Sequence, residues 1–192
     1  MNNWQNQIQS LCGILSLLQI SIQNNNVTAD TGFSQLKKLT EKLRETRNTI
    51  YVIGNGASAS MASHFAADLA KNGKLHTQVF SDLALITAIS NDIGYDQVFA
   101  EPLRRMGEKN DMLVAISSSG NSSNLLAAIA EAKQIGMKSV TLSAMNKDNP
   151  LRQIGDINLY VPAQTYGDAE SCHAAILHHW IDLILAKEER EG

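Results

Sequence analysis

The chain has 192 residues, a formal net charge of −3, 44% hydrophobic residues and 18% charged residues. This length suits one domain with a full hydrophobic core, and the composition is that of a globular chain rather than a disordered one. Because there is no surplus of basic residues, we expect no non-specific nucleic-acid binding. The charge does not argue against a small anion, which helix N-termini can hold without added lysine or arginine.

The two cysteines, Cys12 and Cys172, form neither a disulfide framework nor a zinc-finger spacing. An apolar run from Leu11 to Ile20 has no positive charge before it and is too short to cross a bilayer. We therefore expect a cytoplasmic protein with reduced thiols, no secretory signal and no membrane partner.

Two helices are expected first. Apolar residues at helical spacing predict an amphipathic helix over about residues 5–23, which the asparagines at 24–26 end. A second helix is predicted from about Thr31 to Arg47. We interpret the whole chain as a single domain in which residues 1–48 form an N-terminal helical segment. The first helix has no obvious partner in a sheet, so we expect it to pack between subunits.

From residue 49 on, strands alternate with helices. Pro102 falls inside a periodic stretch from Tyr95 to Met106, so it should kink that helix or mark its start. The alternation predicts a parallel sheet with helices on both faces. Strands are predicted over 49–53, 76–80, 112–117, 138–143 and 157–161, and helices over 57–71, 122–135 and 169–189.

Two segments of similar pattern, 50–58 and 112–122, carry the clearest functional signal. Each is an apolar strand, then a turn of glycine and small polar residues, then a helix. Ligands bind outside the carboxyl ends of parallel strands, and a helix N-terminus favours an anion. A phosphate site therefore outweighs the plainer interpretation that these residues only make turns and N-caps. The hydroxyl donors would be Ser58, Ser117, Ser118, Ser119 and Ser122, with Gly54, Gly56 and Gly120 allowing close backbone approach.

Two nucleotide-binding motifs are incomplete. The turn Gly54-Asn55-Gly56 lacks the third glycine of the dinucleotide fingerprint, and no Gly-Lys-Ser or Gly-Lys-Thr is present for a triphosphate loop. Asp82 could mimic the acid that binds a ribose, so a nicotinamide-dependent oxidoreductase stays as a distant alternative.

A set of acids and histidines could perform proton transfer or hold a metal. His64 and Asp68 are four residues apart on one helical face, and Glu170 and His178 lie two turns apart on the last helix. A carboxylate and a histidine can share the proton transfers of an isomerisation. Alternatively, all four residues form a nitrogen–oxygen set compatible with zinc.

The other histidines of the last helix, His173 and His179, are interpreted as surface or interface residues. For His64, a packed and hydrogen-bonded histidine is an equal alternative.

Four motifs together resemble the sugar isomerase (SIS) domain family, and more narrowly its phosphoheptose isomerase branch. They occur in the order and spacing of that branch and, with the helices at both ends, cover nearly the whole chain. The four motifs are Gly54–Ser58, Ser63–Asp68, Asn91–Tyr95 and Ile116–Ser122.

The resemblance implies a three-layer, flavodoxin-like sandwich with a five-stranded parallel sheet. It implies a homotetramer whose active sites are built between subunits. It also implies interconversion of sedoheptulose 7-phosphate and D-glycero-D-manno-heptose 7-phosphate through a cis-enediol, the entry step to heptose for lipopolysaccharide or capsule.

The resemblance also assigns roles to individual residues. Asp68 would be the base or a metal ligand, and His178 the acid or a metal ligand. His64 would complete a zinc site, and Glu170 would bind substrate or metal. The other substrate and phosphate ligands would be Asn55, Gly56, Ser58, Asp92, Ser117, Ser118, Ser119 and Ser122.

Two residues depart from the usual pattern of the branch, which carries glutamate at position 68 and glutamine at position 170. Other members of the wider family are non-catalytic, including one that binds a replication initiator. The alternatives are therefore a non-catalytic phosphosugar- or protein-binding module, or an isomerase for a different phosphosugar. Asp68 and His178 favour an enzyme.

Overall fold

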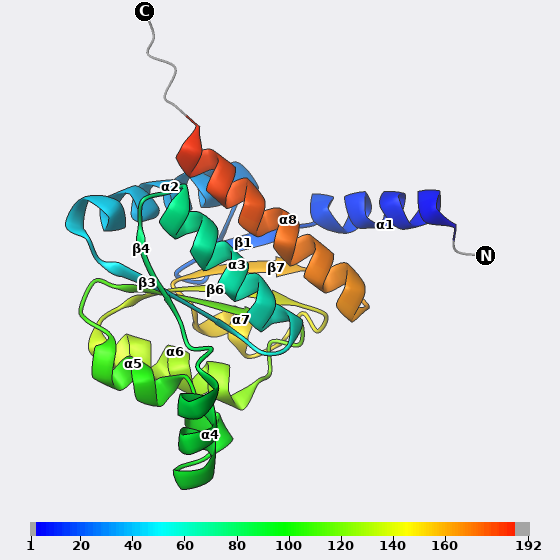
Figure 1. The fold of residues 1–192 in the computed structure, drawn as a ribbon. Coiled ribbons are helices and arrows are strands. Elements are labelled where there is room, and N and C mark those ends of the chain that lie inside the picture. The colour runs from blue at the N-terminus through cyan, green and yellow to red at the C-terminus, as the bar shows by residue number, and fades with distance from the viewer. Residues whose placement is uncertain (1–2, 187–192) are drawn as a thin grey trace, which may run out of the picture.

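The computed structural model describes residues 3–186, which fold around one seven-stranded sheet of order β2-β1-β7-β6-β5-β3-β4 (Figure 1). Adjacent strands from β7 to β4 pair in parallel. The α/β class and the five parallel strands are confirmed, and the sheet is two strands wider than predicted. The parallel strands are β3 (Thr49–Gly54), β4 (His76–Val79), β5 (Met112–Ser117), β6 (Lys138–Ala144) and β7 (Ile157–Val161).

The two additional strands, β1 (Gln19–Ile22) and β2 (Asn25–Val27), form a hairpin where the sequence predicted helix. β1 pairs antiparallel with β7 and extends the sheet. Gln23 and Asn24 have positive φ angles of 48° and 66°, which a two-residue hairpin turn of this hand requires. The predictions of a helix over 5–23 and of a wholly helical segment over 1–48 were therefore wrong at residues 19–27.

Helices cover both faces of the sheet (Figure 1). One core lies between the sheet and α2 (Ala29–Thr46), α3 (Ala57–Lys71) and α8 (Tyr166–Leu185). The second core lies on the other face. Its helices are α4 (Leu83–Asp92), α5 (Ala100–Met106), α6 (Ser123–Ile135) and α7 (Leu151–Ile154).

The last helix starts three residues before the predicted Ala169, with Thr165 as its N-cap. The predicted end of that helix, at Glu189, lies outside the described residues. Every residue of β5 is buried, so the strand before the second turn is the centre of the fold.

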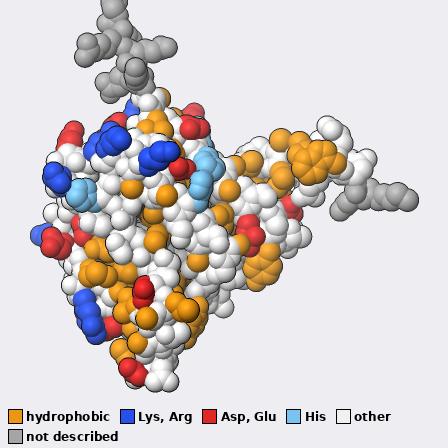
Figure 2. Space-filling view, in the orientation of Figure 1, with side chains coloured by type: hydrophobic (Ala, Val, Ile, Leu, Met, Phe, Trp, Pro, Cys, Tyr) orange, Lys and Arg blue, Asp and Glu red, His pale blue; other side chains and the backbone are white. Residues whose placement is uncertain are grey.

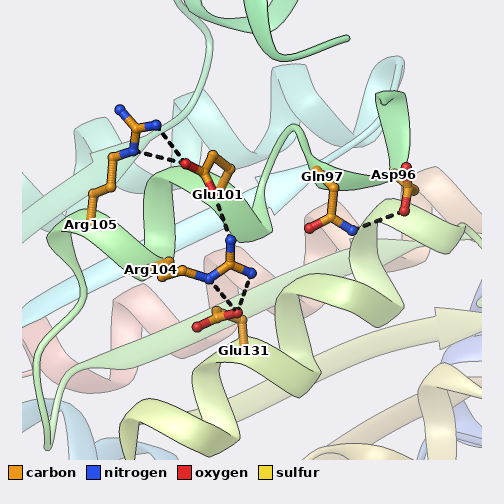
Figure 3. Close-up of polar contacts among 6 residues, drawn as sticks. All are labelled: Asp96, Gln97, Glu101, Arg104, Arg105 and Glu131. Carbon is orange, nitrogen blue, oxygen red and sulfur yellow. Dashed lines mark hydrogen bonds and ion pairs between the residues drawn. The ribbon is translucent and has the colours of Figure 1, made fainter. Parts of the chain in front are cut away.

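The stretch from Tyr95 to Met106 is two elements, not one helix: a 3-10 turn, η1 (Tyr95–Gln97), and then α5. Pro102 lies in the first turn of α5, which confirms that it marks a helix start. Ion pairs hold α5 to α6 (Figure 3). Arg104 bridges Glu101 at 2.6 Å and Glu131 at 2.7 Å.

In this network the hydrogen bond from Arg105 lowers the pKa of the Glu101 carboxyl, and the charges of Arg105 and Arg104 add to the effect. The network therefore holds α5, the helix that follows the turn η1 and its Tyr95, against α6.

Helix α1 (Trp4–Ser16) extends away from the body of the molecule (Figure 1). None of its residues is buried, and the Trp4 side chain is 75% exposed. The helix meets the N-terminal end of α8, where the Gln7 side-chain amide donates to Asp168 Oδ1 at 2.7 Å. Among the described residues, no helix is long and apolar enough to span a membrane.

Candidate active site

The two turns predicted from the sequence meet at one edge of the sheet. β3 and β5 are neighbours in the sheet, and Gly54 pairs with Ile116 in their parallel register. Both strands therefore end at the same level, and the turns that follow them, residues 55–56 and 118–122, stand side by side. α3 and α6 begin directly after these turns, so two helix N-termini converge on the same place.

These two helices differ from the other long helices of the described chain at their N-termini. A side-chain oxygen caps α1, α2, α4 and α8, but neither α3 nor α6 has such a cap. The N-cap residues of the uncapped pair are Gly56 and Ser122. The turns use some of the first N–H groups, since the Ser58 amide donates to the Asn55 carbonyl and the Leu125 amide to the Ser122 carbonyl, each at 3.0 Å. The N–H groups that remain at such uncapped starts, together with the helix dipole, attract anions.

Two glycines let the backbone follow these tight paths. A Cβ at Gly54 would lie 2.7 Å from the backbone of Ser58, so only glycine allows α3 to start this close to β3. Gly120 has a φ of 64°, and a Cβ there would lie 2.0 Å from the Asn149 side-chain oxygen. A larger residue at either position would move the turn.

A pair of amides ties the two turns together. The Asn55 side chain donates to Asn124 Oδ1 at 2.9 Å, and the Asn124 side chain donates back to Asn55 Oδ1 at 3.0 Å. The Tyr95 hydroxyl donates to the same Asn55 oxygen at 3.1 Å, although Tyr95 itself is exposed. Residues from three segments of the chain therefore fix the mouth of the site.

The predicted serines have several roles in the second turn. Ser117 Oγ accepts from the Gly120 amide at 3.0 Å, and Ser119 Oγ accepts from the Asn121 amide at 3.4 Å, so both stabilise the loop itself. Ser118 is buried, with 5% of its surface exposed. Ser58, in the first turn of α3, is also buried. Ser117 and Ser119 thus have a role in the turn itself, and their role as phosphate ligands stays a prediction.

The acid and histidines predicted on different helices meet between α3 and α8. One possible ligand atom from each of His64, Asp68 and His178 lies within 4.8 Å of the others. His64 Nε2 is 3.4 Å from Asp68 Oδ2, and the two imidazole centroids are 5.4 Å apart. Figure 2 shows histidine side chains at the surface over α3 and α8. A slot of about 30 Å³ lies beside the pair of histidines, lined otherwise by apolar residues of the two helices.

The cluster fits a divalent metal. Ligands about 2.0–2.2 Å from a tetrahedral zinc stand roughly 3.3–3.6 Å from one another, and the His64–Asp68 distance of 3.4 Å lies in that range. Two imidazoles and one carboxylate leave a fourth position open, as catalytic zinc sites do. The same residues could also perform proton transfer without a metal.

Two other predicted residues lie apart from these groups. Glu170 is half-buried in the first turns of α8 but is not among the described residues whose ligand atoms gather at His64, Asp68 and His178. Asp92, the last residue of α4, is exposed and accepts from the Asn91 side chain at 2.8 Å. It lines a hollow of about 330 Å³ with residues of α4 and α5, away from the two turns.

The prediction that His173 lies at the surface or at an interface was wrong. It is 1% exposed and faces the core between α8 and the sheet. Burial lowers the pKa of its imidazole from 6.5 to about 4, and the nearby Ser143 backbone opposes this shift only in part. Neither ring nitrogen has a hydrogen bond of good geometry within the described residues. His179 is exposed and packs edge-on against Phe33, with the ring centroids 4.5 Å apart.

Two residues of the site were not selected from the sequence. Asn124 is 1% exposed, and its position two residues after Ser122 places it in the first turn of α6. A buried asparagine at a helix start signals a polar partner, since such a group is costly without one. Tyr95 lies within a motif that was recognised, but its contact with Asn55 depends on the path of the chain between α4 and α5.

Comparison with known proteins agrees with this geometry. A family model described as "SIS domain" matches residues 22–144. The phosphoheptose isomerase of Helicobacter pylori strain Shi470 is 40% identical over 147 residues, which cover 73% of this chain and 76% of the relative.

Solved structures of phosphoheptose isomerases are similar to this chain over nearly its whole length. The Francisella tularensis structure has a TM-score of 0.82 at 27% identity and covers 96% of this chain and 95% of its own. The Neisseria gonorrhoeae structure has a TM-score of 0.81 at 27% identity and covers 94% of each chain.

Proposed function

Because the chain belongs to the SIS domain family and to its phosphoheptose isomerase branch, we propose that it interconverts sedoheptulose 7-phosphate and D-glycero-D-manno-heptose 7-phosphate. The observation that carries this proposal is the cluster of His64, Asp68 and His178, two residues of which stand on α3, the helix whose uncapped N-terminus follows the first turn. Ser58 and His64 are six residues apart, about 9 Å along α3 and about 120° around it, so the buried Ser58 and the exposed His64 lie on different faces of the helix. In this proposal the active sites are built between subunits, and the oligomer brings the phosphate turns and a cluster together.

In this proposal the phosphate is held by the N–H groups that begin α3 and α6 and by the hydroxyls of Ser58, Ser117, Ser118, Ser119 and Ser122. Asn55 holds the two turns together, and Gly56 lets the phosphate approach the backbone. Binding of a part of the substrate that does not react positions the reacting carbons, which can lower the barrier by several kcal/mol.

The chemistry falls to Asp68 and His178. Asp68 takes the proton from the carbon next to the carbonyl and returns it to the neighbouring carbon, so that a cis-enediol stands between the two sugars. His178 donates a proton to the carbonyl oxygen and recovers one from the adjacent hydroxyl. Each such proton transfer by a positioned side chain is worth about 10²–10⁴ in rate.

We also propose zinc as the cofactor, with His64, Asp68 and His178 as the residues that would hold it through one atom each. An atom that held the ion would not carry a proton, so the second carboxylate oxygen of Asp68 and the second ring nitrogen of His178 would then make the proton transfers described above. A bound zinc ion would polarise the two sugar oxygens. Glu170 and Asp92 stay predicted substrate ligands, and Glu170 a predicted metal ligand, although neither lies in the cluster formed by this single chain.

The test is turnover of sedoheptulose 7-phosphate by the wild type and by Asp68→Asn, each with added zinc and after chelation. We expect turnover that zinc stimulates and that falls at least 10²-fold in Asp68→Asn. Asp30→Asn is a matched control, because Asp30 is exposed on α2 and makes no contact with the cluster. Binding of the sugar phosphate without turnover under any metal would instead favour a non-catalytic binding module or a different phosphosugar.

A second comparison separates the acid from its neighbour on the same helix. His178→Gln should lose turnover, whereas His179→Gln should keep it, because His179 faces Phe33 of α2 rather than His64. Equal losses in the two variants would contradict the role given to His178.

We propose that the protein is a cytoplasmic homo-oligomer, as a tetramer, in the synthesis of heptose for surface polysaccharides. The exposed α1, with Trp4 75% exposed near the start of α8, supports an intersubunit role for this helix. Trp4→Glu should leave the fold of each chain intact and reduce the mass measured by light scattering. A wild-type protein that is monomeric at assay concentration would contradict the proposal.

A further inference from the structure

His173 is the buried polar side chain that the mechanism above does not use. It is 1% exposed, and neither ring nitrogen makes a hydrogen bond of good geometry within the described residues, although the Ser143 backbone lies close enough to oppose part of the fall in the pKa of the imidazole. A buried polar group without a partner is costly, and most such groups in folded proteins are paired. A better-placed partner than the Ser143 backbone would therefore stabilise this imidazole.

The sheet register places the serine turn next to this imidazole. His173 packs against the backbone of Ser143 on β6, and Ser143 pairs with Ser117 on β5. One residue further, the ladder continues, because the Ala144 amide donates to the Ser118 carbonyl at 3.1 Å. Ser118 is thus still held against β6, one strand away from the place where His173 lies.

Side-chain alternation puts Ser118 and His173 on the same face of the sheet. Along β5, the side chains of Met112, Val114 and Ile116 belong to the core that contains α8. Because side chains alternate along a strand, Ser118 continues this series and Ser117 does not. Ser117 accordingly bonds within its own loop, while the Ser118 side chain, 5% exposed, continues the series on the face that carries α8.

From this geometry we infer that His173 is a positioning residue for the serine turn, which donates a ring N–H to Ser118 Oγ while the Ser118 hydroxyl donates to a bound phosphate. A neutral imidazole has one N–H to give, and a hydroxyl can accept one hydrogen bond while it donates another. A chain of two such bonds in a buried site polarises both, so the serine becomes a better donor to the anion. The inference rests on the proposed phosphate site.

The test measures inorganic phosphate affinity by isothermal titration, which does not depend on turnover. His173→Phe keeps a ring of similar size and removes both nitrogens, and we expect it to bind phosphate about tenfold more weakly, the effect of one hydrogen bond. KM for the sugar phosphate should rise by a similar factor while kcat changes less than about twofold. A folded His173→Phe that binds phosphate as the wild type does would overturn the inference.

A double-mutant cycle separates positioning from a general loss of packing. If His173 acts through Ser118, the effect of His173→Phe on phosphate affinity should largely disappear in a Ser118→Ala background. The same tenfold loss in that background would show that the imidazole acts by another route.

If His173→Phe does not fold, His173→Asn and His173→Gln provide the comparison. Their amide N–H groups stand near the positions of Nδ1 and Nε2, so one of the two should bind phosphate clearly more tightly than the other. Equal affinities would overturn the inference. A wild type that does not bind phosphate would mean that the proposed phosphate site itself is wrong, whereas unchanged affinity in the variants would leave that site in place.

Discussion

The amide pair between Asn55 and Asn124 should be the most sensitive point of the site. Asn124→Asp keeps the size of the side chain and the oxygen that accepts from Asn55, at 2.9 Å in the wild type. It removes the N–H that donates to Asn55 Oδ1 at 3.0 Å, and it brings a carboxylate oxygen against that carbonyl oxygen. The change therefore tests the pairing rather than the packing.

The expected loss of folding free energy has two parts, the lost hydrogen bond and the unfavourable contact between two acceptor oxygens. One net hydrogen bond contributes about 1 kcal/mol, and a buried acceptor left facing another acceptor costs about 1–3 kcal/mol more. The sum, roughly 2–4 kcal/mol, should lower the melting temperature of a domain of this size by about 4–16 °C. Phosphate affinity should fall as well, because the new negative charge stands between the two turns.

Thermal unfolding followed by circular dichroism at pH 7.5 and pH 5 gives the measurement. Because burial favours the protonated form of the introduced carboxyl, and the protonated form can donate to Asn55 Oδ1, the deficit should shrink as the pH falls. Asn26→Asp, an exposed change on β2, is the matched control. A melting temperature for Asn124→Asp within about 1 °C of the wild type at pH 7.5 would refute this account of how the turns are held.

Two further predictions concern the turn glycine and the buried histidine. Gly120→Ala should destabilise the fold by about 2–4 kcal/mol and weaken phosphate binding, because the backbone φ at this position is 64° and the added Cβ would displace the Asn149 side chain. The control is Gly13→Ala, where the Cβ would enter open space on a helix, and urea unfolding should show it to be neutral or stabilising. Because the pKa of His173 is about 4 in the fold and about 6.5 when exposed, the unfolded chain binds the extra proton. Stability should therefore fall by about 3 kcal/mol as the pH drops from about 6.5 to 4, and the pH slope for His173→Phe should be shallower by up to one proton in that window; identical slopes would contradict it.

The position of the two turns could be predicted from the sequence because it depends on local pattern and on sheet geometry alone. An apolar strand followed by a glycine-rich turn and a helix fixes where the turn lies, and parallel strands bring such turns to one edge. The convergence of Ser58 and Ser118 follows from the register of β3 and β5, which needs no knowledge of side-chain packing. The amide pair of Asn55 and Asn124 was not predicted, because it depends on rotamers within two adjoining turns.

The hairpin of β1 and β2 was missed because two periodicities overlap in the same residues. Leu11, Ile14, Leu15 and Leu18 follow a helical spacing, whereas Leu18, Ile20 and Ile22 alternate as in a strand, so a single window extends the helix too far. What ends the helix is pairing of β1 with β7, a contact across more than 130 residues. Such tertiary pairing overrides local propensity and does not appear in any local window.

Asp68 and Glu170, the two residues that depart from the usual pattern of the branch, differ in their relation to the cluster of His64, Asp68 and His178. His64 and Asp68 are one turn apart on α3. The 3.4 Å between His64 Nε2 and Asp68 Oδ2 equals the separation expected of two ligand atoms on one tetrahedral zinc, so aspartate, although shorter than glutamate, is long enough at this position. Glu170 stands about 12 Å along α8 from His178, eight residues away, and lies outside the cluster. A divalent ion there would meet one carboxylate and two neutral imidazoles, which leaves a net charge of +1. In the proposed mechanism that charge would stabilise the negative oxygens of an enediol, and a second carboxylate ligand would cancel it.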